Sequence, residues 1–265
     1  MVFESFLRGL KLVKIGFQVL GKDKEILLLP LAAVGIVAAM FILTFALLFI
    51  ALLINPIIFI VIFIIELVIA SFVTTFFQAA VVECARIRLT GGDPKARDGI
   101  KLASTRKKAI FTWAIVNLLV GSVIQSLERR LGRLFGSLMS FTWRTATIFV
   151  LPVILYEKLG AWGSVKRSAQ LIKKGWGEAI SSGLGIGILF FILALPGLGL
   201  LYFAMVSGSL IMGAPLIIIA IIYWFVLSIV NNAIKGIIVA ALYVTVSGKR
   251  SADKRIHEIE KILSK

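Results

Sequence analysis

Few of the side chains that enzymes use most often occur in this sequence. Its 265 residues include one cysteine, Cys84, one histidine, His257, and 13 acidic residues. A single cysteine excludes an intrachain disulfide and a zinc site built on thiolates. The patterns HExxH and GxSxG, a Walker-type glycine loop and a cysteine–histidine set are also missing. We therefore expect no catalytic, cofactor-binding or metal site, and we expect that the protein is not an enzyme.

The two rare side chains have plain structural interpretations. Cys84 is interpreted as a small apolar residue near the end of a helix. His257 lies beside Glu258 and Glu260 on a short helix predicted for residues 251–263, and it is interpreted as a solvated residue of that helix.

Charge is nearly absent from residues 26–82, a stretch that contains one ionisable side chain, Glu66. As a single α-helix this stretch would be about 85 Å long, whereas the hydrocarbon core of a bilayer is about 30 Å thick. The chain must therefore cross the membrane, turn and cross again. Asn55-Pro56 marks the turn, because proline removes a backbone donor and disfavours helix in the residue before it.

The same pattern continues along the chain, since 60% of the residues are apolar. The sequence predicts an all-α polytopic membrane protein with six transmembrane helices arranged as three hairpins. We expect a kink or break in the fifth span at Pro196-Gly197. The six predicted spans cover residues 27–54, 57–82, 109–127, 134–156, 180–206 and 215–246.

Each hairpin is preceded by a short amphipathic helix with basic residues on its polar face. The first covers residues 3–20, the second residues 94–106 with Asp93 as its N-cap, and the third residues 161–176. In the third, one face is predicted to carry Trp162, Val165, Ala169, Ile172 and Trp176. Such helices either lie in the membrane interface or pack on the protein itself; the interface is the interpretation we favour for the first.

The chain is thus expected to form one membrane domain over residues 1–265. Its predicted parts are an interfacial helix (1–24), the first hairpin (26–89), the second interfacial helix and hairpin (93–156), the third (161–247) and a cytoplasmic tail (249–265). This order of one basic helix and two spans occurs three times. It reflects either an internal repeat or the common layout of a six-span protein with basic cytoplasmic loops.

The net charge of +16 does not indicate a nucleic-acid partner, because the basic residues are not gathered on one domain. Twenty-four of the 29 lysine and arginine residues lie in segments 1–25, 83–108, 157–179 and 247–265, and three lie between 128 and 133. By the positive-inside rule, both termini then face the cytoplasm of a multi-pass protein of the cell membrane. We expect anionic lipid headgroups as partners of the basic face.

Three stretches of the sequence resemble a prokaryotic family of six-span integral membrane proteins that is known only as a domain of unknown function. They are FQAAVVECARIRLTGG (77–92), FVLPVILYE (149–157) and RSAQLIKKGWGE (167–178). More loosely, a basic helix leading into a span is similar to the membrane domain of some glycerophosphodiester phosphodiesterases. The resemblance implies a membrane location and no established activity, cofactor or site residue.

Two charges, Glu66 and Arg144, are predicted at matching depth, each about ten residues from the outer end of its span. A lone charge in hydrocarbon costs several kcal/mol, so we expect these two side chains to touch. The pair either fixes helix packing, which we favour, or lines a polar path.

The sixth span carries three further polar residues, Asn231, Asn232 and Lys235. At least one of the two asparagines is expected to form an interhelical hydrogen bond, with Asn117 or Gln78 as candidate partners by depth. Lys235 is expected to extend toward the cytoplasmic surface. In the fifth span, Gly183 and Gly187 permit a close helix approach, within one chain or between copies in a homo-oligomer.

Two functions remain open from the sequence. The favoured one is a membrane scaffold or partner subunit without a catalytic centre. The alternative is a small channel or transporter that uses the intramembrane polar residues on spans two, four and six. A transporter predicts a hydrated cleft near the midplane lined by several of these residues, whereas a scaffold predicts that they are paired within a filled core.

Overall fold

The computed structural model describes the backbone of residues 2–174 and 176–247, and the side chains of 10–173, 187–209 and 211–247. The predicted tail helix 251–263 with His257, and the side-chain surroundings of the small-residue pair at Gly183, lie outside these ranges.

Every described element is a helix, which confirms the all-α class. The elements are α1 (Val2–Lys22), a 3-10 helix η1 (Lys24–Leu27), α2 (Leu28–Ile54), α3 (Pro56–Leu89), α4 (Ala96–Thr105), α5 (Lys107–Leu131), α6 (Arg133–Ala146), α7 (Val150–Tyr156), α8 (Ala161–Lys174), α9 (Trp176–Val206) and α10 (Leu210–Val246). Among the described residues six segments are long and apolar enough to cross a membrane, and these correspond to the six predicted spans.

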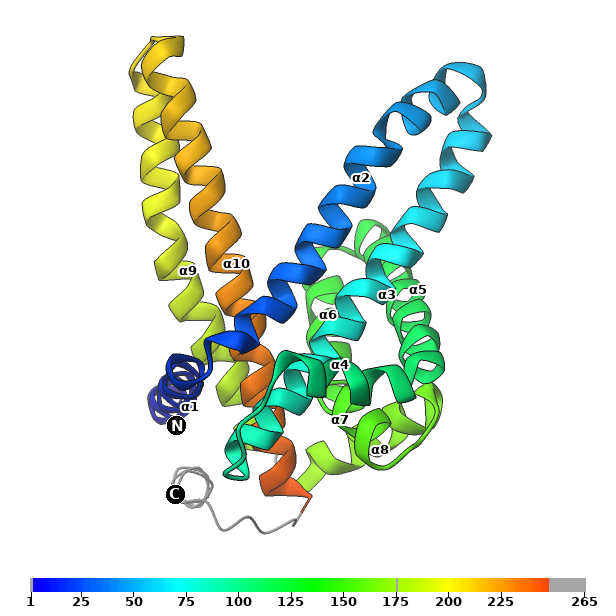
Figure 1. The fold of residues 1–265 in the computed structure, drawn as a ribbon, viewed down its shortest axis with the longest axis vertical. Helices are drawn as coiled ribbons and strands as arrows, with labels where there is room; N and C mark the ends of the chain where they lie inside the picture. Colours follow the sequence, from blue (N-terminus) through cyan, green and yellow to red (C-terminus); the bar gives the residue numbers. More distant parts are fainter. Residues whose placement is uncertain (1, 175, 248–265) are drawn as a thin grey trace.

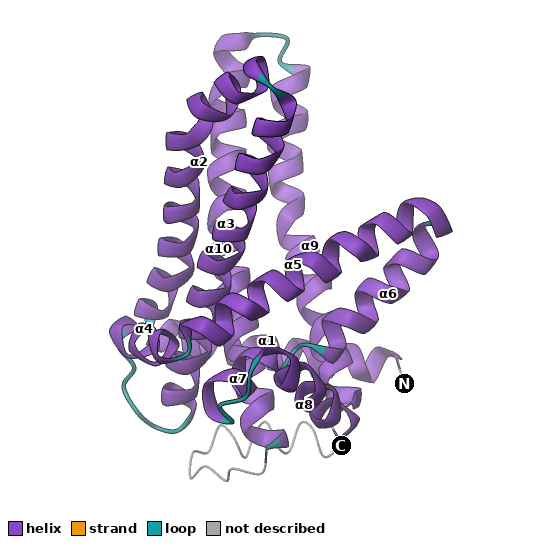
Figure 2. Ribbon diagram, turned by 90° about the vertical axis from the view of Figure 1, so that its right-hand side faces the viewer, coloured by secondary structure: helices purple, strands orange, loops and turns teal. Residues whose placement is uncertain are grey.

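Three helical hairpins, α2–α3, α5–α6 and α9–α10, diverge from a common base (Figure 1). The base consists of α1, η1, α4, α7 and α8 with the adjoining ends of α3 and α10. The α2–α3 and α9–α10 hairpins form a V, and the α5–α6 hairpin is inclined to both when the molecule is turned (Figure 2). In each hairpin we call the end at the base the root and the opposite end the tip.

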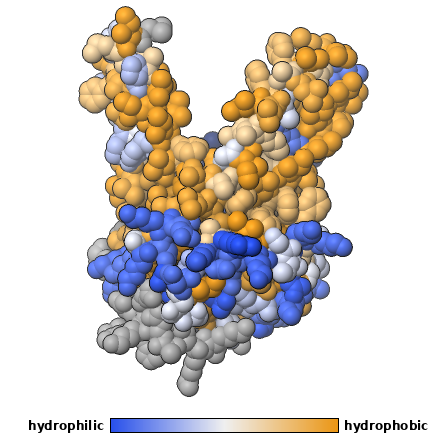
Figure 3. Space-filling view, viewed as in Figure 1, coloured by the Kyte–Doolittle hydropathy of each residue, from blue (hydrophilic) through white to orange (hydrophobic). Residues whose placement is uncertain are grey.

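The hydrophobic core lies in the base, where most of the largest buried side chains gather. They are Leu12, Ile26, Leu29, Leu89, Ile110, Phe149, Ile154, Ile234, Ile237 and Leu242. The hairpins instead expose large apolar side chains, such as Leu43 at 80% and Ile211 at 87%. Figure 3 shows this division, with apolar arms above a hydrophilic band. Exposed apolar surface of this extent fits a lipid environment and not water.

The first hairpin turns where the sequence predicts. The side-chain Oδ1 of Asn55 accepts a hydrogen bond of 2.8 Å from the backbone N–H of Ile57, and Pro56 is the first residue of α3. Asparagine caps the free N–H groups of the helix and proline needs no donor there, so the two residues form a compact turn.

The predicted fourth span is not one helix. α6 ends at Ala146 and α7 begins at Val150, and Ser168 of α8 fills the gap. Its buried hydroxyl donates to the carbonyl oxygen of Ala146 (2.7 Å) and accepts from the N–H of Phe149 (3.1 Å). These bonds supply the partners that the interrupted helix lacks, so the break is possible inside the base.

The buried face of α8 is also shifted by one residue from the prediction. Trp162 is 60% exposed. The buried positions are Ala161, Ser164, Ser168, Leu171 and Ile172. Ile172 of the predicted face is buried and Val165 packs partly on the core, so the prediction was wrong mainly at Trp162. The small serines, in place of the large indole, allow α8 to approach its neighbours closely.

The first basic helix packs on the protein itself. In α1 the side chains of Leu12, Ile15 and Val19 are at most 4% exposed, and the helix contacts α9 and α10. Lys11 and Lys14 are exposed on its other face. Val13 and Leu20, from the face that we expected to lie against lipid, are buried in the protein, whereas Phe17 on that face is 40% exposed, so the protein covers only part of it.

One further local prediction is wrong, and of the kink or break expected in α9 the break is absent. Asp93 does not cap α4; it bonds to Arg88 (2.6 Å), while Asp98 accepts a hydrogen bond of 3.0 Å from the N–H of Lys95 at the start of the helix. In α9 the helix continues through Pro196. Gly197 lies directly against the Trp224 ring, and the Trp224 Nε1–H donates to the carbonyl oxygen of Ala194 (3.2 Å), so an aromatic anchor from α10 supports the helix there.

Candidate functional site

A polar cavity of about 540 Å³ lies between α3, α5 and α6. All three helices belong to segments that are apolar enough to cross a membrane. Its walls combine hydroxyl, amide and charged groups with a few apolar side chains. The lining residues are Ser71, Asn117, Leu118, Gly121, Ser122, Ile124, Gln125, Glu128, Ser140, Trp143 and Arg144. We take this cavity as the candidate site because polar groups that converge in an apolar segment are unusual and point to a ligand.

Two hydrogen bonds between helices fix the root of the cavity. The Ser71 hydroxyl of α3 donates to the carbonyl oxygen of Ala114 in α5 (3.3 Å). The Trp143 Nε1–H of α6 donates to Oδ1 of Asn117 in α5 (3.0 Å). Trp143 also packs on Trp113, with ring centroids 6.0 Å apart. Because the indole occupies the amide oxygen of Asn117, the amide nitrogen of that side chain is left to donate elsewhere.

Arg144 lies in the last turn of α6, at the root of the hairpin. Its side chain is exposed, and no carboxylate among the described residues forms an ion pair with it. Lys235 of α10 is exposed as well but does not line the cavity, so Arg144 is the positive charge on its wall. The root of the cavity is therefore a positively charged region.

The one acidic residue that lines the cavity, Glu128, lies near the tip. Its side chain packs directly over Gly136, close to the turn between α5 and α6. Asn117, beside Trp143, is eleven residues away on the same helix, which corresponds to about 16 Å. The cavity is thus electrically polarised, with its positive end at the root and its negative end toward the tip.

Glu66 does not join this site. It is 3% exposed, and its Oε1 atom accepts a hydrogen bond from the Thr44 hydroxyl of α2, while Oε2 has no partner. The predicted contact with Arg144 is therefore wrong. Five residues separate Glu66 from Ser71, which turns the two side chains about 140° apart around α3. Glu66 faces α2, and the α5–α6 hairpin lies on the side of Ser71.

The asparagines of α10 follow the prediction in part. Gln78 of α3 donates through Nε2 to the backbone carbonyl oxygen of Asn232 (3.4 Å), so an interhelical bond forms, but not to an asparagine side chain. The Asn232 amide donates to the Ser228 carbonyl oxygen of its own helix (3.0 Å). The Oδ1 atom of Asn231 is buried without a hydrogen-bond partner. Asn117, the other proposed partner, bonds to Trp143 instead.

A network of polar side chains in the base links α3, α7, α8 and α10. Glu83 accepts two bonds of 2.8 Å from Arg86 and one of 2.7 Å from the Tyr156 hydroxyl. Glu157 accepts bonds from Arg167 (2.8 Å) and from the Tyr243 hydroxyl (3.2 Å). The rings of Tyr156 and Tyr243 are 5.5 Å apart, which joins the two halves.

The sequence analysis missed this network, although a signal for it was present. Each of the three stretches that carry the family resemblance contains members of the network. The first contains Glu83 and Arg86, the second Tyr156 and Glu157, and the third Arg167. Their use in joining helices depends on tertiary contacts that no local pattern reveals.

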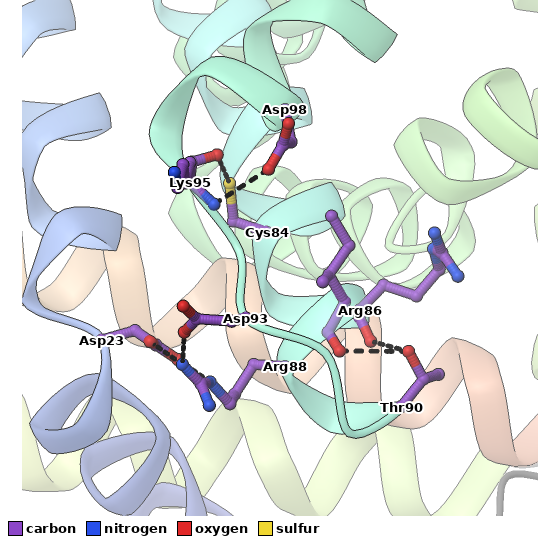
Figure 4. Close-up of polar contacts among 9 residues, drawn as sticks. Asp23, Cys84, Arg86, Arg88, Thr90, Asp93, Lys95 and Asp98 are labelled. Carbon is purple, nitrogen blue, oxygen red and sulfur yellow. Dashed lines mark hydrogen bonds and ion pairs between the residues drawn. The ribbon is translucent and has the colours of Figure 1, made fainter.

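A second polar cluster joins the first hairpin to α4 (Figure 4). Arg88 bonds to Asp23, at the end of α1, and to Asp93. Nearby, Cys84 is buried against Gly99 of α4, as expected for a small apolar residue. Within the described residues no group of histidine, cysteine, aspartate and glutamate is placed to hold a metal ion.

One family model matches the part of the chain that contains the three resembling stretches and the base network. The model of a family of unknown function, DUF6159, matches residues 56–252. The chain belongs to the DUF6159 family. The match begins at the first residue of α3 and includes the second and third hairpins, the polar cavity and the base network. A search of the curated proteins finds no match to the chain.

Proposed function

We propose that this DUF6159 protein is a multi-pass scaffold or partner subunit of the cell membrane, with both termini in the cytoplasm and no catalytic centre. The observation that carries the proposal is the division between a packed base and exposed hairpins. The base holds its helices through a core and two polar networks, while the hairpins leave large apolar side chains uncovered on several faces. Separated hairpins of this kind offer surfaces to lipid, to other membrane subunits or to further copies of the chain.

The charge of the base supports the orientation. Lys11, Lys14, Lys24, Lys101 and Lys166 are all exposed in or beside it. Basic surface next to membrane spans favours the cytoplasmic side, where anionic headgroups attract it. Membrane lipid is therefore the first partner that we propose for this face.

Crosslinking from the exposed apolar faces tests the scaffold role. A photoreactive amino acid is introduced in living cells at Leu43 of α2 or Met205 of α9, which are 80% and 83% exposed. A scaffold predicts discrete protein adducts from these positions, either at twice the mass of the chain or with a reproducible second subunit. Adducts to lipid alone, together with a monomeric mass in native mass spectrometry, contradict the proposal. The matched control is the buried Ala220 of α10, which should yield no intermolecular adduct.

A second candidate, a small channel or transporter, is favoured by the polar cavity, which is lined by Asn117 and Arg144 of the predicted residues. Glu66, Gln78, Asn231 and Lys235 do not line it. A flux assay in liposomes separates the two functions. A transporter predicts flux above empty liposomes that Arg144→Gln reduces, whereas the scaffold predicts no flux from the wild type or from Glu66→Ala.

A further inference from the structure

The polar cavity between α5 and α6 has the composition of an anion site that opens within the membrane. Arg144 provides a guanidinium at the root, and Asn117 and Ser140 provide neutral groups that can donate hydrogen bonds. No described carboxylate neutralises Arg144, although an isolated charge in an apolar segment is costly. An anion that binds there would remove this cost.

We propose that this cavity binds a phosphate group, and that the group belongs to the headgroup of an anionic phospholipid. A planar guanidinium presents parallel N–H groups that match two oxygens of a phosphate. The amide nitrogen of Asn117 can donate a third bond, because its oxygen is already held by Trp143. The chemistry is that of a phosphate ester, and a lipid or a soluble phosphate compound could supply it.

The position of the cavity favours the lipid. It lies beside α3, α5 and α6, all of which belong to segments apolar enough to cross a membrane. Leu118 and Ile124 line it next to the polar groups, so an acyl chain can continue along apolar surface. Glu128 at the far end repels a phosphate there, and the headgroup is therefore oriented toward the root.

This site goes beyond the scaffold role and does not rest on it. General attraction of the basic face to anionic membranes is nonspecific and is weakened by salt. A phosphate site at Arg144 instead binds one lipid molecule per chain, and the affinity depends on one side chain. The two are distinguished by changing Arg144 and an equally charged residue elsewhere on the same hairpin.

The test is native mass spectrometry of the full chain with three probes. These are short-chain phosphatidylglycerol, the matching diacylglycerol without phosphate, and glycerol phosphate as a soluble competitor. We expect one phosphatidylglycerol to bind the wild type, with an affinity roughly tenfold or more lower in Arg144→Gln, as for the loss of charge-assisted bonds. Diacylglycerol should bind the wild type no more tightly than it binds Arg144→Gln. Displacement of the lipid by glycerol phosphate at similar concentration assigns the site to a soluble phosphate compound.

The matched control is Arg129→Gln, which removes the same charge from an exposed position near the tip of the hairpin. It should bind phosphatidylglycerol within about twofold of the wild type, because rim charges contribute little. Equal binding by the wild type and Arg144→Gln, or equal binding of diacylglycerol and phosphatidylglycerol, overturns the proposal. If Arg144→Gln does not fold, Arg144→Lys replaces it. Lysine keeps the positive charge but lacks the parallel N–H groups of the guanidinium, so we expect a severalfold weaker affinity for phosphatidylglycerol. An unchanged affinity contradicts the site.

Discussion

In the base, small and polar side chains join helices that belong to different hairpins. Above it, the α2–α3 and α9–α10 hairpins are held mainly by the contacts within each pair, while α5 also contacts α3 through Ser71 and Phe72. Gly99 and Ser168 allow close approach or complete a broken backbone, and Glu83 and Glu157 join four helices. In the hairpins, Glu66 meets only Thr44 of the neighbouring helix. The comparison indicates that the helices are joined to one another chiefly in the base, whereas the hairpins leave large apolar side chains uncovered.

We expect the largest loss of stability in the base when a larger side chain is introduced where α4 crosses α3. A Cβ atom at Gly99 would collide with the backbone carbonyl of Ala80 and lie 2.8 Å from the Cys84 sulfur. Because backbone cannot move aside, Gly99→Ala should lower the unfolding free energy by about 3 kcal/mol. Thermal unfolding in detergent measures the loss.

The matched control for Gly99→Ala lies in a hairpin. Gly121 of α5 has no atom within 4 Å of an added Cβ. Gly121→Ala should be neutral or stabilise the protein by up to about 1 kcal/mol, because alanine favours helix. Equal loss of stability at both positions would show that base and hairpin do not differ in packing.

The next test removes a charge from the base network. Glu83→Gln leaves Arg86 and the Tyr156 hydroxyl without their carboxylate, and we expect a loss of about 2 kcal/mol, since Glu83 is buried but Arg86 is partly exposed. Urea unfolding in mixed micelles measures it. Glu25→Gln, at an exposed position where the amide oxygen can still accept the bond from the Ala96 N–H, should change stability by less than about 0.5 kcal/mol.

Ser168→Ala sharpens the comparison at the break between α6 and α7. The N–H of Phe149 and the carbonyl oxygen of Ala146 would both lose their bonds to the hydroxyl. Leaving buried backbone groups without partners should cost about 1.5 kcal/mol. Faster hydrogen exchange at residues 147–150 is the readout, and Ser137→Ala, at an exposed position of α6, should leave exchange there unchanged.

The smallest effect is expected in the first hairpin. Glu66 has one carboxylate oxygen without a partner, so Glu66→Leu should be neutral or stabilise the protein by about 1 kcal/mol. A loss above about 2 kcal/mol would show that the charge is needed for folding. Thermal unfolding under the conditions used for Gly99→Ala allows direct comparison.

Local chemistry was sufficient to predict the spans and the first turn. Asparagine and proline at positions 55 and 56 act within two residues, and long apolar runs require a membrane whatever their neighbours are. The chain therefore reveals its class and its hairpins without tertiary information.

The remaining features depend on direction around a helix and on distant partners. Depth along the chain placed Glu66 and Arg144 together, but depth does not say that Glu66 faces α2. The role of Ser168 was not predicted, because its two partners lie about twenty residues earlier in the chain. The cavity at Arg144, which we propose binds a phosphate group, depends on the break at residues 147–149, because the break ends α6 and places this side chain at the root of the hairpin.

The divergence of the hairpins can be measured directly by distances between spin labels in lipid nanodiscs. Labels at Ile54 and Met212, at the tips of α2 and α10, are compared with labels at Leu31 and Lys235, nearer the roots of the same two helices. The structure predicts that the tip pair is much farther apart than the root pair. A tip distance equal to or shorter than the root distance would show a closed bundle and would contradict the separation of base and hairpins.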